Sequence, residues 1–237
     1  MNTLTKIASP LLLALPLVAA PVSAAELNIE VTNLTNGIHF TPLLITAHDD
    51  SVDFFTTGVA ASPALISMAE GGVIDDLMTE NPGPNAVHRE NPAGGLLAPS
   101  MSIATTLSTN ELDHLSIVAM MLPTNDGFIG LDSWAIPEEA GTYTVYLNGY
   151  DAGSEANTEL LSSNSGQETI PNPPPLGLTA QNASGVASTD NNETVHIHRG
   201  NIGDIDANGG ASDLDSRVHR WLNPVAKVVI TVAEDAE

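Results

Sequence analysis

Short runs of apolar residues, many of them alternating with polar ones, constrain the fold of this chain more than any other feature. Residues 27–31, 142–147 and 225–232 alternate, and residues 115–122 (LSIVAMML) are almost continuously apolar. A period of two places successive side chains on opposite faces of a β-strand. Turn-forming residues separate most of these runs, so the sequence predicts an all-β fold, an antiparallel β-sandwich. Weaker strand candidates are residues 53–55, 101–107 and 193–198.

Helices are expected to be few, with one or two short crossover helices between strands. The best candidate begins at Ser62 and Pro63, a serine N-cap followed by proline in the first helical position, and ends at Gly71 and Gly72. Residues 80–99 and 162–192 are rich in Pro, Gly, Asn and Ser and lack an apolar period. We predict surface loops for both stretches.

The N-terminal residues have the pattern of a secretory signal peptide. A weakly basic start is followed by an apolar run at residues 11–20 and by small residues at 22–25. We expect residues 1–25 to be a signal peptide cleaved after Ala24 or Ala25, and residues 26–237 to form one domain, secreted or periplasmic. The apolar run is short for a bilayer and no later segment could cross one, so no integral membrane segment is expected.

Acidic residues outnumber Lys and Arg by 29 to 6, which gives a formal net charge of −23 at pH 7. This balance argues against nucleic acid as a partner, because a phosphate backbone would be repelled. An acidic excess is typical of a solvated acidic surface and also of a set of cation sites, and charge alone does not separate the two. The chain has no cysteine, so no disulfide stabilises its core.

Two segments dense in oxygen ligands each follow an apolar strand, TNDGFIGLD and YDAGSEANTE. If the strands at 115–122 and 142–147 run in the same direction, with 127–132 returning between them, Asp126, Asp151 and Glu155 converge at one end. Three neighbouring carboxylates repel one another unless a hard cation lies between them, and Ca²⁺ accepts such oxygens in flexible geometry. The alternative is that these acids only cap turns.

Two other groups of residues could bind metal. Residues 204–215 follow the spacing of an EF-hand loop, with Asp204 first and Asp215 last, but no apolar helix precedes them. His196 and His198 lie two apart on a candidate strand, with His219 a possible third ligand, as in a zinc or copper site. A loop without metal and hydrogen-bonded structural histidines are the alternatives.

Motifs of several common enzyme classes are missing from the sequence. It contains no Gly-x-Ser-x-Gly elbow, HExxH helix, phosphate-binding glycine loop or cysteine nucleophile. Asp151 with Glu155 could serve glycoside hydrolysis, but two Trp and three Tyr provide little aromatic surface for a sugar. We therefore expect a protein that is not an enzyme.

Longer segments occur in a recognisable order along the chain. They are HFTPLLITAHDDSVDFFTTGVAASPALISMAEGG, LSIVAMMLPTNDGFIGLDSW, YDAGSE, and DANGGASDLDS ahead of NPVAKVVITV. This order resembles the spondin domain of F-spondin and mindin over residues 27–232, and the cysteine-free form is similar to bacterial spondin-domain proteins. The resemblance implies a β-sandwich similar to calcium-dependent membrane-binding domains, one bound calcium and a role in extracellular adhesion.

The resemblance also implies which residues hold the calcium. The family's ligands fall on Asp126, Asp151 and Glu155, although TNDGF lacks the family's tryptophan and the last ligand is glutamate instead of aspartate. No residue matches a partner-binding motif, so the expected extracellular ligand stays open between matrix, polysaccharide and membrane surface. The alternatives are a periplasmic or extracellular metal-dependent hydrolase using the same acids with His196 and His198, and a purely structural surface or matrix protein.

Overall fold

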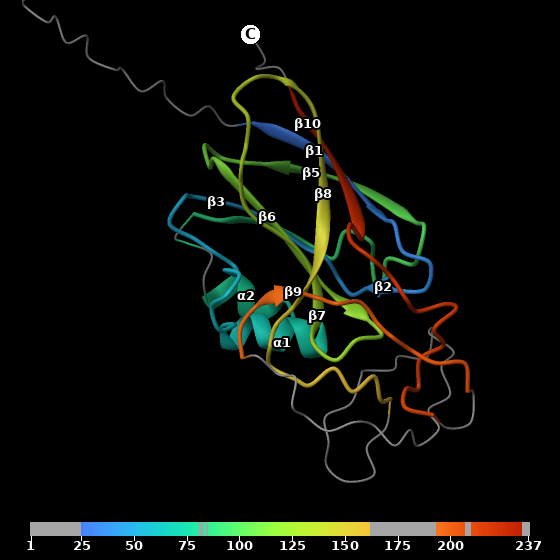
Figure 1. Cartoon of the computed structure of the whole chain (residues 1–237). Helices are drawn as coiled ribbons and strands as arrows, with labels where there is room; N and C mark the ends of the chain where they lie inside the picture. Colours follow the sequence, from blue (N-terminus) through green and yellow to red (C-terminus); the bar gives the residue numbers. More distant parts are fainter. Residues whose placement is uncertain (1–24, 81–82, 84, 162–192, 207–209, 234–237) are drawn as a thin grey trace, which may run out of the picture.

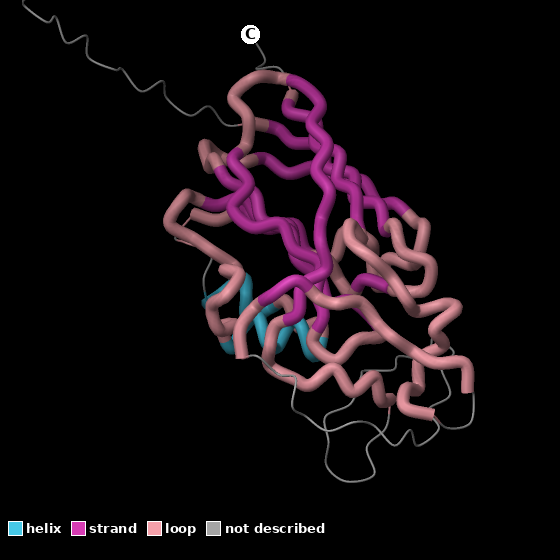
Figure 2. The backbone as a smooth tube through the Cα atoms, viewed as in Figure 1, coloured by secondary structure: helices cyan, strands magenta, loops and turns pink. Residues whose placement is uncertain are grey.

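The computed structural model describes residues 25–80, 83, 85–161, 193–206 and 210–233. Ten strands and two short helices make up the described part, with the helices gathered near one end of the sheet (Figures 1 and 2). The strands are β1 Glu26–Asn33, β2 His39–Phe40, β3 Leu44–His48, β4 Val87–Glu90, β5 Ser102–Ser108, β6 His114–Leu122, β7 Gly127–Ala135, β8 Gly141–Asp151, β9 His196–Ile197 and β10 Ala226–Val232. The helices are α1 Pro63–Gly71 and α2 Asp75–Glu80.

All strand pairs are antiparallel, and the main path of the sheet runs β4-β3-β6-β7-β8-β10-β1-β5. The short strands β2 and β9 pair with β6 and β8. The sheet curls until its two edge strands meet, where the Arg89 Nε of β4 donates to the Thr106 carbonyl of β5 at 3.0 Å. The antiparallel all-β expectation is therefore confirmed, in the form of one nearly closed, barrel-like sheet.

The alternating strands place their apolar side chains inside this barrel. In β1, Leu27, Ile29 and Val31 are buried, and Val228 and Ile230 of β10 join them in the main core. A second apolar cluster lies on the outer face of β6 and β7, beneath α1 and α2. Strand β6 is buried on both faces because it lies between the two clusters, which explains why its sequence is continuously apolar.

Local capping signals place α1 where the sequence predicts it. The Ser62 Oγ accepts a hydrogen bond from the Leu65 N–H at 3.1 Å, and Pro63 occupies the first helical position. The helix ends at Gly72, whose φ of 69° is the left-handed conformation that glycine adopts without strain.

Two of the secondary-structure predictions are wrong. Residues 80–99 are not one loop, because β4 pairs along β3 as an edge strand. Its sequence, VHRE, is mostly polar and has no strong strand pattern, and the pairing with β3 stabilises it. Residues 53–55 form no strand, although Phe54 is buried in the second cluster.

The proposed signal peptide and the predicted loop at 162–192 lie outside the described residues. Neither helix in the described part of the chain has the length and apolar character that a membrane crossing needs.

Candidate metal centre

The ends of three neighbouring strands bring the two oxygen-rich segments to the same rim. Strands β6 and β8 run in the same direction, with β7 returning between them, as the sequence analysis required. Gly127 at the start of β7 pairs with Asp151 at the end of β8, and the Ala152 N–H donates to the Asp126 carbonyl at 3.1 Å. Asp126 and Asp151 therefore lie in adjacent chain segments although they are 25 residues apart.

Asp126 is fully buried, and its carboxylate anchors the following loop. Its Oδ2 accepts hydrogen bonds from the backbone N–H groups of Ser154 and Glu155 at 2.9 and 3.0 Å. Its Oδ1 is also buried and has no hydrogen-bond partner among the described residues. Burial removes the hydrogen bonds that a carboxylate makes to water, and buried polar atoms nearly always have protein donors in their place. A buried carboxylate oxygen without a donor is therefore unusual.

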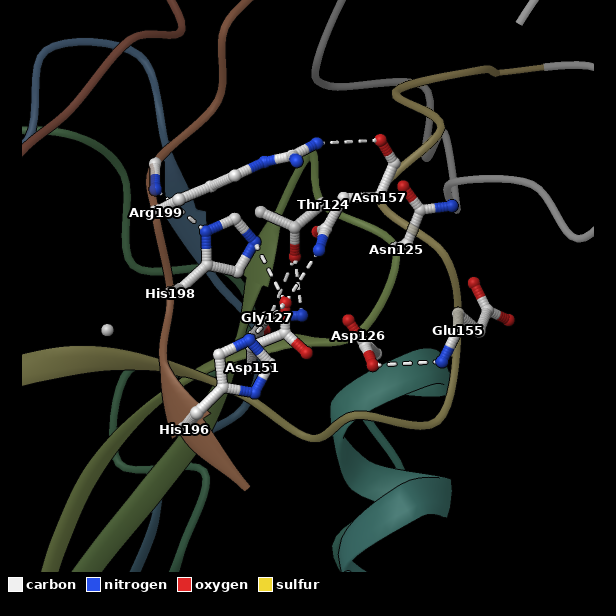
Figure 3. Close-up of polar contacts among 12 residues, drawn as sticks. Thr124, Asn125, Asp126, Gly127, Asp151, Glu155, Asn157, His196, His198 and Arg199 are labelled. Atoms are coloured by element: carbon white, nitrogen blue, oxygen red, sulfur yellow. Dashed lines mark hydrogen bonds and ion pairs between the residues drawn. The ribbon is translucent and has the colours of Figure 1, made fainter. Parts of the chain in front are cut away.

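Asp151 is buried beside it, as Figure 3 shows. Its Oδ1 accepts from the Gly153 N–H at 2.9 Å, and its Oδ2 accepts from the Asn157 amide at 2.7 Å. The Nε2 atoms of His196 and His198 lie 3.7 and 4.0 Å from the same Oδ2. Asn157 reaches Asp151 from the loop after β8, His196 from strand β9, and His198 from the residue that follows β9.

The proximity of the two carboxylates has an electrostatic cost. Burial, and next the negative charge of Asp151, raise the pKa of Asp126 to about 6, against the lowering effect of its hydrogen bonds from Ser154 and Glu155. Asp126 is therefore largely ionised at neutral pH, but in a position that disfavours its charge. A cation between the two carboxylates would remove this penalty.

Glu155 belongs to the same loop, but its side chain takes another direction. The residue is buried and its N–H binds Asp126, whereas its carboxylate points away from Asp126 and Asp151 (Figure 3). Within the described ranges, no group of three or more His, Cys, Asp or Glu side chains is arranged to hold a metal ion. The structure thus brings together two of the three carboxylates predicted from the sequence.

The donor set of this pair fits a hard cation. Asp126 Oδ1 and the Asp151 carboxylate supply negatively charged oxygens, and Ca²⁺ completes its coordination with carbonyl, amide and water oxygens. The loop after β8 turns tightly at Gly153, where φ is 73° and an added Cβ would lie 2.5 Å from the Thr194 backbone. Glycine is needed here, because a side chain would separate the loop from Thr194.

The two histidines near Asp151 differ in the nitrogen that can bind a metal. The His196 Nδ1 donates to the Thr194 carbonyl at 2.9 Å, which leaves a lone pair on Nε2. The His198 Nδ1 instead accepts from the Gly200 N–H at 2.9 Å, so the neutral ring carries its proton on Nε2. Burial lowers the pKa of His198 to about 4, so the ring is neutral at pH 7. The pair offers one imidazole lone pair toward Asp151, fewer than a histidine-rich zinc site requires.

The EF-hand-like segment is described only in part, because residues 207–209 lie outside the described ranges. The Asp204 carboxylate accepts from the N–H groups of Asp206 and Ala211, both at 2.9 Å, which lowers its pKa. The Asp215 carboxylate binds the Arg217 guanidinium, and hydrogen bonds from Arg217 lower its pKa to about 2. Both acids therefore have donors from protein groups, as expected for a turn-capping role.

Sequence reasoning missed the polar groups that support this rim from the next segment. Buried Glu159 accepts from the N–H groups of Ile202 and Gly203 at 2.5 and 2.8 Å. The Asn125 Oδ1 accepts from the Glu159 N–H at 3.2 Å. A glutamate four residues beyond Glu155 was visible in YDAGSEANTE, but its partners Ile202 and Gly203 lie 43 and 44 residues further along the chain.

Comparison with protein families gives one match. The family model described as Spondin_N matches residues 32–189, more than half of the 237-residue chain. The matched region contains Asp126, Asp151 and Glu155, whereas β9, β10 and the segment at 204–215 lie beyond it. Strand β10 nevertheless lies between β1 and β8 in the sheet. Comparison with curated proteins gives no match.

Proposed function

Because this chain belongs to the Spondin_N family, we propose that it is an exported, non-catalytic recognition or adhesion module whose rim loops are ordered by calcium. Spondin_N domains are typically extracellular adhesion or recognition modules and are generally non-catalytic. Export is part of the proposal, since the signal peptide proposed for residues 1–25 would deliver the chain to a compartment where calcium is available.

One observation carries the calcium proposal: the buried Asp126 carboxylate lies next to Asp151 and has an Oδ1 without a donor among the described residues. Two adjacent buried carboxylates are destabilising when ionised unless a cation offsets their charge. Asp126 and Asp151 would hold the ion. Glu155 would join them by rotating its side chain, because its backbone already contacts Asp126.

The role of calcium in this proposal is structural. Asp126 precedes β7, and Asp151 ends β8, so an ion bound to both would connect the β6–β7 loop to the loop after β8. Ordering these loops would fix the shape of the rim that an extracellular partner meets. We propose matrix, polysaccharide or membrane surface as the class of partner, in keeping with the adhesion modules of the family.

Calcium titration by calorimetry tests the proposal. We expect saturable binding to the wild-type chain lacking residues 1–25, and at least about tenfold weaker binding to Asp151→Asn, since a charged ligand contributes about 1.5–3 kcal/mol. Asp50→Asn is the matched control, because it removes one carboxylate from an exposed position outside the rim. Equal affinity of Asp151→Asn and the wild type would refute the assignment.

The Glu155→Gln variant tests the third ligand separately. If the Glu155 carboxylate turns toward the ion, affinity falls by roughly the same factor as for Asp151→Asn. Unchanged affinity would remove Glu155 from the ligand set and leave Asp126 and Asp151 in place.

The two alternative functions predict different outcomes. A metal-dependent hydrolase using His196 and His198 would bind zinc more tightly than calcium and turn over sugar or ester substrates. A structural surface or matrix protein would self-assemble when calcium is added, which light scattering detects. Calcium binding by a monomer that shows no turnover would support the recognition module over both.

A further inference from the structure

A second candidate site lies on the outer face of the sheet, away from the buried acids. A cavity of about 560 Å³ opens over β7 and β8 beside the segment that follows β3. Its wall contains three aromatic rings, two carboxylates and an amide: Phe55, Tyr146, Tyr150, Asp53, Asp132 and Asn148. The size suits a small organic molecule, and aromatic walls with a few polar groups are typical of ligand sites.

Two of the three rings in the wall, Phe55 and Tyr150, are fixed by their contacts before any ligand binds. The Phe55 ring lies over Gly130 so closely that an added Cβ there would be 2.5 Å from the Phe55 Cζ. Ring centroids of Phe55 and Tyr150 are 4.8 Å apart, and Phe128 packs against both rings. The segment after Phe55 is held by the Gly58 N–H, which donates to the Val195 carbonyl at 2.7 Å. A ligand would therefore meet a pre-formed aromatic surface.

The charge of the wall is negative. The Asp132 Oδ1 accepts from the Phe54 N–H at 2.7 Å, which fixes this carboxylate at the cavity. Burial and the nearby charge of Asp53 raise the pKa of Asp132, because each disfavours a further negative charge in this partly buried place. No Lys, Arg or His is among the lining residues in the described part of the chain. Lys227 pairs in register with Tyr146 but does not line the cavity.

This cavity is distinct from the candidate metal centre. Tyr146, Asn148 and Tyr150 lie on the outer face of β8, whereas Leu147, Gly149 and Asp151 alternate with them and are buried inside. The two sites are therefore on opposite faces of the same strand, and the second does not depend on the calcium proposal.

We propose that this cavity binds an organic ammonium ion, such as the head group of a quaternary or primary amine. The faces of Phe and Tyr rings attract cations through the ring quadrupole, and the two carboxylates complement the charge. An anionic ligand would meet two carboxylates and no cationic side chain among the described lining residues. A small hydrated metal ion would gain nothing from the three rings, whereas an alkylammonium group is both cationic and apolar.

Choline and its uncharged isostere 3,3-dimethylbutan-1-ol test the proposal, since the two differ in charge but hardly in shape. Calorimetric titration of the chain lacking residues 1–25, in saturating calcium and again with chelator, should show saturable binding of choline and much weaker binding of the alcohol. Binding in both conditions separates this site from the metal centre. Failure of calcium binding would leave this result unaffected.

Two variants with matched controls locate the site. Tyr146 is 58% exposed, so Tyr146→Ala should fold normally and weaken choline about two- to fivefold, the effect of about 0.5–1 kcal/mol from one exposed cation–π contact. Thr144→Ala, on the same face of β8 outside the cavity, should have no effect. Asp53→Asn should weaken choline about tenfold, and Asp50→Asn hardly at all.

Four outcomes would overturn the proposal. Equal binding of choline and the alcohol would show an apolar pocket without charge selection. Saturable binding of glucose in place of choline would show a neutral sugar site. The absence of saturable binding by either probe, or choline binding unchanged in both Tyr146→Ala and Asp53→Asn, would show that the cavity is not an ammonium site.

Discussion

Replacing Asp126 with asparagine should stabilise the calcium-free protein at neutral and alkaline pH. The asparagine oxygen can still accept from the Ser154 and Glu155 amides, and the new NH₂ group can face Asp151. The variant therefore removes a buried charge without removing its hydrogen bonds. Most substitutions of a buried, hydrogen-bonded residue lower the free energy of unfolding, so an increase in Asp126→Asn would point to the removal of an unfavourable charge.

The magnitude follows from the raised pKa of Asp126. A rise from 3.8 to about 6, at 1.36 kcal/mol for each pKa unit, corresponds to about 3 kcal/mol. Since the folded state binds the proton more tightly than the unfolded state, stability is highest below the unfolded value of 3.8 and falls as pH rises through 6. The asparagine side chain of the variant cannot ionise, so Asp126→Asn should match the wild type near pH 3.8 and exceed it by up to about 3 kcal/mol near pH 8.

Urea unfolding of both proteins with chelator, at several pH values, measures this difference directly. In thermal melts near neutral pH it should appear as roughly 6–12 °C, because about 1 kcal/mol shifts a domain of this size by 2–4 °C. Asp50→Asn controls for the smaller net charge. A lower free energy of unfolding for Asp126→Asn than for the wild type near pH 8 would show that the Asp126 charge is not destabilising. A difference in this free energy that does not change with pH would show the same.

Three other substitutions have expected outcomes. Gly153→Ala should lower the free energy of unfolding by at least about 2 kcal/mol, because its φ is 73° and the new Cβ would clash with the Thr194 backbone; urea unfolding measures this. Ser62→Ala should cost about 1 kcal/mol in the same assay, since it removes the cap of α1, and an unchanged midpoint would contradict that role. Lys227→Met should strengthen choline binding roughly twofold by calorimetry, since it removes a cation beside Tyr146; weaker binding would argue against an ammonium ligand.

Features that depend on neighbouring residues in the chain could be predicted from the sequence. Ser62, Pro63 and Gly72 define α1 because capping is a local interaction of side chains with nearby backbone groups. The meeting of the Asp126 and Asp151 loops was also predictable, because three successive antiparallel strands leave their ends at alternating rims. Strand β4 was not predictable, because its four residues, three of them polar, are held by pairing with β3 rather than by a strand pattern of their own.

The two candidate sites show more clearly which features could not be predicted from the sequence. The direction of the Glu155 carboxylate is a choice of rotamer, and no spacing in YDAGSE encodes it. The position of His198 beside Asp151 depends on β9 pairing with β8 across more than 40 residues. The outer cavity depends on Phe55 lying over Gly130, a contact between residues 75 apart. Such contacts form only in the folded sheet, between residues that are far apart in the chain. Short-range sequence patterns therefore do not predict them.

The meeting of β4 and β5 also limits how this protein can associate with others. An open sheet ends in rows of unsatisfied amide and carbonyl groups, which invite strand exchange and fibrous aggregation. Here those two edge strands face each other across the Arg89–Thr106 contact, so each shields the backbone of the other. If the chain is an adhesion module, as proposed, this closure means that it would bind partners through loops and side chains rather than by pairing an edge strand with a strand of the partner.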